Sequence, residues 1–290
     1  MRQVLLIGGS SFIGKNLIKK FPSDWNIKAT YCNSKDFLEF SSSFQNVEPI
    51  KLDLKQEIIP NLGKVDMIFY LPTFTPGQVF GNKKLNIDTM YCLHAHGIDY
   101  ILQQVESCEI VYYFSSGVYF LRNDYSDYRK SKLLGEANLQ SLSMEKKFNY
   151  VILRNMEVYG PYLAKHKLYR KICEAYNCNV ERFEVFGDGK NLIDTMYIDD
   201  YTELLLNLIN NNIKNIILPF GRSKPVTIKE LIKTVSKVYK ENNVTVEYKG
   251  NPTENTNFIL NNRELLKYVD FTPDIDLFDG LSKWKNKGLI

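Results

Sequence analysis

Residues 3–14 read QVLLIGGSSFIG, an apolar run that ends in two adjacent glycines and is followed, five residues later, by a third. A short, continuous apolar run bounded by glycine is typical of a buried strand. From residue 12 to residue 21 the apolar side chains recur at helical spacing. The segment therefore predicts a strand, a tight glycine turn and a helix in immediate succession.

The glycine turn has the context of a dinucleotide-binding turn. Gly8 allows a tight turn, and the backbone amides at the start of the helix can face a pyrophosphate. Gly14 would let the helix pack close to the sheet. Tight turns also use glycine for steric reasons alone, but the succession of strand, turn and helix favours cofactor binding. The residues expected to bind the cofactor here are Gly8, Ser10, Ser11, Phe12, Ile13 and Gly14.

Strand and helix patterns alternate along most of the chain. Strands are expected at 26–31, 49–53, 66–71, 109–115, 149–154 and 215–219, and helices at 85–105, 126–146, 199–210 and 227–241. This alternation implies right-handed βαβ units and a parallel sheet. We predict an α/β fold, a Rossmann doubly wound parallel sheet with a smaller C-terminal lobe. The dinucleotide-binding domain would span 1–158 and about 194–222, and the substrate-binding lobe about 159–193 and 223–290.

Composition narrows the class of protein. The chain has 290 residues, 44% hydrophobic and 24% charged, as in an ordinary soluble globular protein. A net charge of +4 without a long basic block disfavours nucleic acid as a partner. The five cysteines lack CxxC spacing, so reduced thiols are expected. No secretory leader or membrane-spanning segment is recognisable, so we expect a cytoplasmic location and no membrane partner.

The end of the second strand bears on cofactor choice. A carboxylate there would bind both ribose hydroxyls of NAD. The best register places Tyr31 at that end, followed by Asn33 and Lys35. With no carboxylate and a cation nearby, NADP(H) is slightly favoured over NAD(H), unless the register differs by a residue or two.

Ser115, Tyr128 and Lys132 form a second candidate group. Tyr128 and Lys132 stand four residues apart in a predicted helix, so they share one face about 6 Å apart. An adjacent ammonium and an oxidised nicotinamide ring would lower the pKa of the phenol from near 10, so that it can exchange a proton at neutral pH. Ser115, at the carboxyl end of a parallel strand, would hydrogen-bond the same substrate oxygen. This relay suits hydride transfer at a carbinol carbon and needs no metal.

The order of these motifs resembles that of the extended short-chain dehydrogenases/reductases, the NAD(P)-dependent sugar epimerase/dehydratase family. Tyr-x-x-x-Lys by itself occurs by chance on many helices, and this chain has 19 tyrosines. Its weight comes from its place after a glycine turn, two more strands and a strand-end serine. The resemblance runs through nearly the whole chain.

The resemblance implies further cofactor contacts. In GGSSFIG, Ser11 replaces the usual middle glycine. KLDL at 51–54 resembles the segment that holds the adenine, and NIDT at 86–89 resembles a motif whose Asn supports the active-site strand and helix. The cofactor residues expected outside the glycine turn are Tyr31, Asn33, Asp53, Leu54, Leu71, Asn86, Tyr128 and Lys132.

SSGVYF at 115–120 resembles the strand end before the family's Val-Tyr-Gly, which assigns the catalytic hydroxyl to Ser115 rather than Ser116. Dehydratases of the family place Asp and Glu directly after that hydroxyl. Ser116 and Gly117 stand there instead, so a 4,6-dehydratase is not expected. Keto-reduction, alcohol oxidation and epimerisation remain, since they need only hydride transfer and a proton relay.

Several expected substrate contacts differ from the family pattern. Glu157 stands where nucleotide-sugar members have an Asn near the diphosphate, and Ile193 replaces an Arg. Losing an Arg removes a bidentate phosphate clamp, so either other cations meet the phosphates or the substrate lacks a diphosphate. Candidate cations lie in 165–171 and at Arg182, although a solvated helix face explains them as well. The substrate contacts that we expect are Thr73, Ser116, Glu157 and Lys190.

His94 and His96 lack the spacing and the carboxylate partner of a zinc site, so a surface or interface role is expected. Members of the family usually dimerise through the helices corresponding to 85–105 and 128–146, which implies a homodimer.

Three functional hypotheses follow. The first is an NAD(P)-dependent ketoreductase acting on a small molecule, a sugar that is nucleotide-linked, with Tyr128 as acid/base, Lys132 tuning it and Ser115 orienting the substrate oxygen. The second is a nucleotide-sugar epimerase that keeps NAD tightly bound. The third, from another class, is a non-catalytic dinucleotide-binding regulatory subunit, which the presence of both Tyr128 and Lys132 disfavours.

Overall fold

The computed structural model describes residues 1–55, 60–74, 79–80, 83–84, 87–117, 126–240, 243–250 and 257–288. They divide into two compact units. The first is formed by most of the described residues of 1–155 together with Ile209–Leu218, and the second contains the described residues of Met156–Leu208 and Pro219–Ile290.

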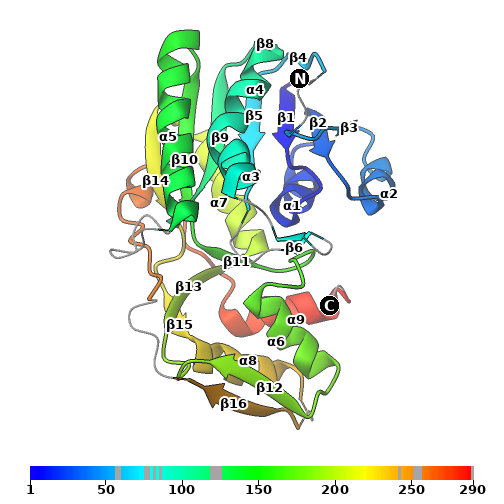
Figure 1. The fold of residues 1–290 in the computed structure, drawn as a ribbon, viewed down its shortest axis with the longest axis vertical. Helices are drawn as coiled ribbons and strands as arrows, with labels where there is room; N and C mark the ends of the chain where they lie inside the picture. Colours follow the sequence, from blue (N-terminus) through cyan, green and yellow to red (C-terminus); the bar gives the residue numbers. More distant parts are fainter. Residues whose placement is uncertain are drawn as a thin grey trace. The chain divides into compact units, whose positions relative to one another are not determined.

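A seven-stranded sheet forms the centre of the first unit, with strand order β14-β10-β9-β5-β1-β2-β3 (Figure 1). The pairings from β10 across to β3 are parallel. Because the chain proceeds from β1 toward β3 on one side and toward β10 on the other, the ends of β1 and β5 lie at the topological switch point. The strands are β1 (Gln3–Ile7), β2 (Asn26–Tyr31), β3 (Val47–Lys51), β5 (Met67–Tyr70), β9 (Ile110–Ser116), β10 (Asn149–Asn155) and β14 (Ile216–Phe220).

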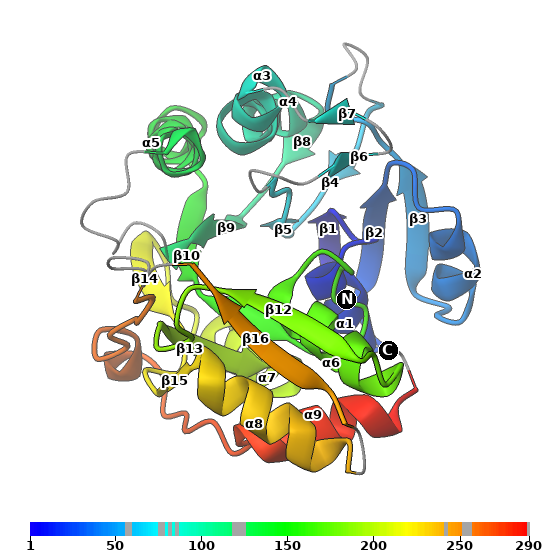
Figure 2. The same ribbon diagram turned by 60° about the horizontal axis from the view of Figure 1, so that its bottom comes forward.

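Helices cover both faces of this sheet. Figure 2 shows α1 (Phe12–Lys20) on one face and α3 (Ile87–Tyr91), α4 (Gly97–Gln103) and α5 (Asp127–Lys146) on the other, with α2 (Asp36–Ser42) beside the β3 edge. The core under α4 and α5 includes Ile98, Val111 and Leu139, all fully buried. Burying such a side chain stabilises the fold by about 1.5–3 kcal/mol.

Small sheets complete the first unit. β4 (Gly63–Lys64) pairs with β8 (Val105–Ser107), and β6 (Val79–Phe80) pairs with β7 (Lys83–Lys84).

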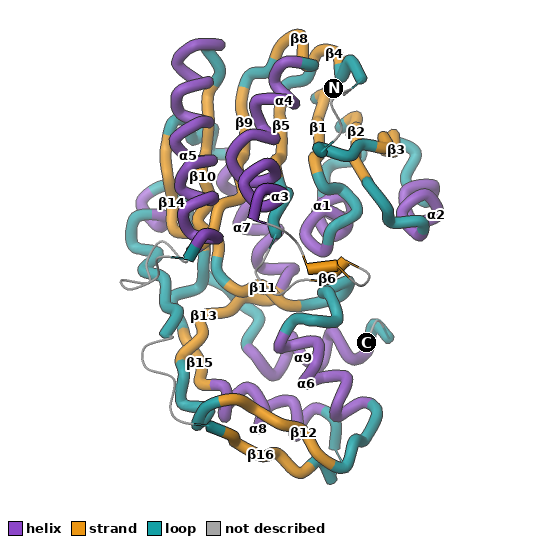
Figure 3. Tube along the Cα trace, in the orientation of Figure 1, coloured by secondary structure: helices purple, strands orange, loops and turns teal. Residues whose placement is uncertain are grey.

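The predicted helix at 85–105 contains a π-helical turn. Its described part runs through α3, a π turn η1 (Cys92–His96) and α4, one continuous helical path in Figure 3. A π turn is wider than an α turn and changes which side chains face inward. Within η1, His94 and Ala95 are buried.

The second unit combines two small sheets with helices. Sheet β11-β13-β15 is formed by Glu157–Tyr159, Leu192–Tyr197 and Pro225–Thr227, and sheet β12-β16 by Arg182–Phe186 and Thr245–Lys249. Its core includes Tyr159, whose ring stacks on Tyr169 with centroids 4.8 Å apart. The helices are α6 (Leu168–Asn177), α7 (Ile198–Asn210), α8 (Ile228–Val238), the short η3 (Leu265–Lys267) and α9 (Leu277–Asn286).

The predicted α/β class and parallel Rossmann sheet are confirmed. The third strand begins two residues earlier than expected, because Val47 pairs with Ile27 of β2. Residues 194–208 group with the second unit, whereas the sequence-based division places about 194–222 in the first. The physical reason is that β13 pairs with β11 and β15. The assignment of roles to the two domains stays a prediction.

Candidate active site

The glycine turn after β1 is held by main-chain hydrogen bonds. Gly8 has a φ of +87°, which favours glycine, and its N–H donates to Thr30 Oγ1 over 2.9 Å. Ser11 N–H donates to the Gly8 carbonyl over 2.9 Å. A Cβ at Gly14 would lie 2.5 Å from that carbonyl oxygen, so only glycine lets α1 begin so close to the strand end.

Ser11 acts as the N-cap of α1. Its hydroxyl accepts from Gly14 N–H over 3.1 Å, and the following residues Phe12 and Ile13 open the helix. No acidic residue lies in the first turn. A capped helix start without acidic residues, beside a turn at which Gly9 and Gly14 leave no room for a Cβ, fits a dinucleotide pyrophosphate. The predicted turn residues are therefore brought together.

The strand ends next to this turn carry the other predicted cofactor residues. Tyr31 is the last residue of β2, as expected, and Leu71 lies against Gly8, because a Cβ there would be 3.3 Å from Leu71 Cβ. Burial raises the pKa of the Cys32 thiol, and the nearby Asp53 raises it further. Leu54 is buried and Asn33 is exposed. Asn86 lies outside the described residues.

A carboxylate that the sequence analysis did not consider lies beside the turn. Asp36, at the start of α2, accepts from Lys15 Nζ of α1 and, over 2.7 Å, from Ser34 Oγ. These hydrogen bonds hold the pKa of Asp36 below its usual range. The Lys15 side chain is buried, whereas that of Asp36 is 66% exposed. The end of β2 therefore has the ion pair Lys15–Asp36 nearby, whereas the sequence led us to expect a cation, Lys35, without a carboxylate.

Tyr128 and Lys132 lie on α5, four residues apart as predicted. The Tyr128 hydroxyl is 3.3 Å from Thr73 Oγ1, in the segment that follows β5. Lys132 is 2% exposed, and its ammonium donates to the carbonyls of Pro72 over 3.3 Å and Phe114 over 3.2 Å. Burial lowers the pKa of Lys132 to about 7, partly opposed by Glu136. Tyr128 and Lys132 therefore both contact the segment that follows β5, Tyr128 through Thr73 and Lys132 through the Pro72 carbonyl.

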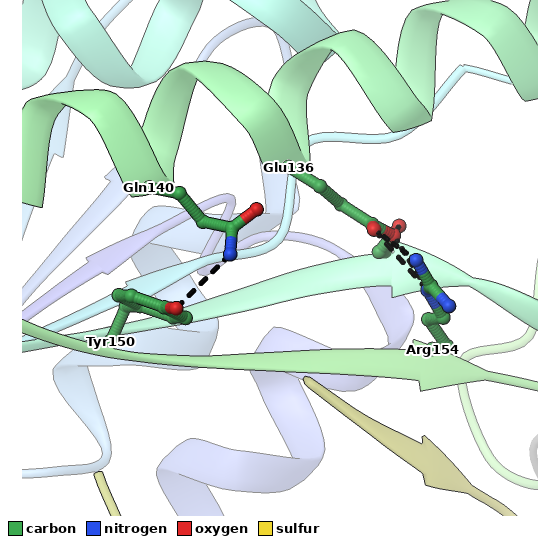
Figure 4. Close-up of polar contacts among 5 residues, drawn as sticks. Glu136, Gln140, Tyr150 and Arg154 are labelled. Atoms are coloured by element: carbon green, nitrogen blue, oxygen red, sulfur yellow. Dashed lines mark hydrogen bonds and ion pairs between the residues drawn. The ribbon is translucent and has the colours of Figure 1, made fainter. Parts of the chain in front are cut away.

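Ser115 belongs to a buried ionic network. Its hydroxyl donates to Glu136 Oε1 of α5 over 2.5 Å. Arg154 on β10 donates to the same carboxylate, from Nη2 to Oε2 over 2.6 Å and from Nε to Oε1 over 3.1 Å. Figure 4 shows the Glu136 and Arg154 side chains facing each other across the space between helix and strand. The hydroxyl proton of Ser115 therefore points at Glu136, which leaves its oxygen to act as an acceptor.

The surface or interface role expected for His94 is wrong for this residue. His94 is fully buried, with Phe74 N–H donating to its Nε2 over 2.8 Å. Met90, Ile98 and Ile101 are also buried at helical spacings from it, a signal that was present in the sequence. His96 is exposed, in line with the expectation.

Comparison with known proteins decides the family. A family model described as the NAD dependent epimerase/dehydratase family matches residues 4–217. The chain belongs to this family. It is an NAD-dependent enzyme of the extended short-chain dehydrogenase type, as the resemblance implied.

Similar proteins include both reaction types of the epimerase/dehydratase family. Human dTDP-D-glucose 4,6-dehydratase is 22% identical over 264 residues, covering 83% of this chain and 75% of the human protein. The structure of a UDP-glucuronic acid 4-epimerase from Bacillus cereus is 18% identical, with a TM-score of 0.84 and coverage of 99% of this chain and 100% of that one. A UDP-glucose 4-epimerase from Thermotoga maritima gives 18% identity and a TM-score of 0.83 over 99% and 100%. The structures share the epimerase fold.

The departures from the epimerase/dehydratase pattern can be placed in the second unit. Glu157 opens β11, and Lys190 pairs with Asp188 at 3.4 Å, with a side chain that is 76% exposed. Arg170 pairs with Glu174, and Arg182 pairs with Glu247. Each of these cations has an acidic neighbour, which weakens the case for a dedicated phosphate clamp. Among the described residues no helix is both long and apolar enough to cross a membrane.

Proposed function

We propose that the protein catalyses reversible hydride transfer at a carbinol carbon of a nucleotide-linked sugar, as an epimerase that keeps its NAD. The observation that carries the proposal is the Tyr128–Lys132 pair on α5, with the ammonium buried between two main-chain carbonyls of strand ends. Such a group can stabilise a phenolate in a site with little water. The glycine turn lies at the same carboxyl edge of the parallel sheet, where ligands bind in these folds.

The roles of the side chains follow from their contacts. Tyr128 would remove the proton of the substrate hydroxyl and later return it. Lys132 would stabilise the phenolate, and Thr73, already 3.3 Å from the phenol, would share its hydrogen bond. Ser115 would accept from the substrate, since its own proton is directed to Glu136. A bound cofactor would supply the hydride acceptor, and the residues of the glycine turn, Tyr31 and Asp53 would hold it.

A second candidate function is ketoreduction with NADP(H). It is favoured by the absence of a carboxylate at the end of β2, where Thr30 and Tyr31 stand. Asp36, held by Lys15 beside the turn, argues for NAD(H) instead. The UDP-sugar epimerases among the similar structures also favour the epimerase. The substrate contacts Thr73, Ser116, Glu157 and Lys190, the homodimer and the cytoplasmic location remain part of the proposal.

The first experiment identifies the cofactor carried by the protein. Protein purified without added nucleotide is denatured, and the released nucleotide is measured by mass spectrometry. Stoichiometric NAD, followed by interconversion of two UDP-sugars in an NMR assay, supports the epimerase. An empty site that binds NADPH more tightly than NADH supports the ketoreductase. If neither nucleotide binds, or if Tyr128→Phe turns over like the wild type, the proposal fails.

A further inference from the structure

His94 uses both ring nitrogens inside the first unit. Nε2 accepts from Phe74 N–H over 2.8 Å, and Nδ1 lies 2.8 Å from Ser131 Oγ on α5. The residue is fully buried in the π turn η1. His94 therefore joins the segment after β5 to α5, two elements of the candidate site that are far apart in sequence.

The partners fix which nitrogen carries the proton. A backbone N–H can only donate, so Nε2 must be the unprotonated nitrogen and Nδ1 carries the hydrogen. Nδ1–H then donates to Ser131 Oγ, and the Ser131 hydroxyl donates to the Tyr128 carbonyl over 2.9 Å. Burial and the nearby Lys132 ammonium hold the pKa of His94 far below its ordinary value. The ring is thus neutral, and its hydrogen bonds run in one direction from the loop to the helix.

Both hydrogen bonds of the His94 ring lead to residues of the candidate active site. The hydrogen bond from Phe74 N–H holds the backbone next to Thr73, and the Thr73 hydroxyl is 3.3 Å from that of Tyr128. The hydrogen bond to Ser131 links His94 to the first turn of α5, because the Ser131 hydroxyl in turn donates to the Tyr128 carbonyl. The His94 ring also meets the Tyr128 ring edge-on, with centroids 5.4 Å apart and planes at 84°. Edge-to-face contacts are a preferred geometry for ring pairs, so the His94 ring also supports the position of the Tyr128 ring.

The absence of a side chain at Gly135 of α5 lets η1 and α5 approach each other closely. A Cβ at Gly135 would lie 2.1 Å from the His94 carbonyl oxygen and 2.2 Å from the Tyr113 hydroxyl. That hydroxyl donates to the same carbonyl over 2.5 Å. π turns are rare, and where they occur they frequently accompany functional sites. The backbone of the turn is therefore held from both sides with His94 facing inward.

We propose that His94 is a positioning residue of the active site, which ties residues 72–74 to α5 and so sets Thr73 against the Tyr128 phenol. This inference rests on the proposed hydride-transfer function for its effect on rate. The tautomer and the two hydrogen bonds can be measured without any substrate.

The experiment compares four variants in the full-length protein. His94→Gln retains an acceptor near the position of Nε2, His94→Asn retains a donor near that of Nδ1, and His94→Ala retains neither. His96→Ala, an exposed histidine in the same turn, is the matched control. The readouts are kcat and KM with a UDP-sugar, ¹⁵N spectra of the three histidines between pH 5.5 and 8.5, and hydrogen exchange at the Phe74 amide.

Because a displacement of about 1 Å can cost about 100-fold in rate, we expect His94→Ala to lower kcat by roughly 10- to 100-fold with little change in KM. The Gln and Asn variants should each recover part of the loss, and His96→Ala should match the wild type. One histidine should keep its Nδ1–H tautomer at every pH, and the Phe74 amide should lose protection in His94→Ala but keep it in His94→Gln.

Two results would overturn the inference. The first is a His94 signal that titrates near pH 6.5, or a Phe74 amide that exchanges as fast in the wild type as in His94→Ala. The second is an active wild type whose kcat His94→Ala does not change. If the wild type shows no turnover, the proposed function fails, and the spectra and amide exchange still decide whether His94 ties the two segments together.

Discussion

Replacing Arg154 with Met should strongly destabilise the first unit. Glu136 is 3% exposed and the Arg154 side chain 13% exposed, and the two form a bidentate pair with a shortest N–O distance of 2.6 Å. Without Arg154, the buried carboxylate keeps the Ser115 hydroxyl as a partner but loses its hydrogen-bonded ion pair, and only the electrostatic interaction with Lys132 remains. Removing one member of a buried pair typically costs about 3–5 kcal/mol. We expect a loss in that range for Arg154→Met.

Replacing both partners with apolar residues separates the cost of the stranded charge from the value of the pair. The double variant Glu136→Leu with Arg154→Met should lose only about 1–2 kcal/mol, because neither charge of the pair is left without the other and Ser115 loses one acceptor. The stability losses of the single variants Glu136→Leu and Arg154→Met, added together, should therefore exceed the loss of the double variant by at least about 2 kcal/mol. The exposed pair Lys130–Asp127, at 3.8 Å on the same helix, supplies the control. Lys130→Met should change stability by less than about 0.5 kcal/mol.

The assay is urea unfolding followed by tryptophan fluorescence. The chain has two tryptophans, and Trp25 lies in the first unit whereas Trp284 lies in the second. In a Trp284→Phe background the signal reports on the first unit alone. A loss below about 1 kcal/mol for Arg154→Met, or a double loss equal to the sum of the single losses, would refute the reasoning.

Four further predictions concern the site. The pKa of Lys132 falls from 10.5 to about 7 on folding, so between these values the unfolded chain binds the extra proton and stability rises with pH. Relative to Lys132→Met, the cofactor-free wild type should gain about 2 kcal/mol from pH 7 to pH 9 in urea unfolding, and a flat difference contradicts this. Gly14→Ala should lower the unfolding free energy by about 1–3 kcal/mol and weaken NADH binding at least tenfold in fluorescence titration, because its Cβ would meet the Gly8 carbonyl at 2.5 Å. Asp36→Asn frees the charge of Lys15 and should shift the ratio of NADPH to NADH affinity roughly tenfold toward NADPH, whereas an unchanged ratio excludes Asp36 from the ribose site. Ser115→Ala should lower both stability, by about 1 kcal/mol, and kcat; an unfolding midpoint equal to that of the wild type would argue against the Glu136 contact.

Local sequence was enough to predict the class of fold and the main elements of the site. The glycine turn follows from steric limits within seven residues, where Gly14 must pass the Gly8 carbonyl. The Tyr128–Lys132 pair follows from the helical repeat, which any four-residue spacing on α5 obeys. The parallel sheet follows from the alternation of apolar strands with helices. These features depend on neighbours in the chain, so a single sequence reveals them.

The remaining contacts depend on residues that only folding brings together. Glu136 and Arg154 are 18 residues apart and lie on different elements, and each looked like an ordinary charged residue until helix packing buried Glu136 and left the Arg154 side chain 13% exposed. His94 hydrogen-bonds to Phe74 and Ser131, which are 20 and 37 residues away, from a π turn that the periodicity of the sequence does not predict. Asp36 meets Lys15 because α2 returns to α1 after β2. A buried polar group must find its partner wherever the fold places one, so the sequence determined the chemistry available and the tertiary structure decided which groups share hydrogen bonds.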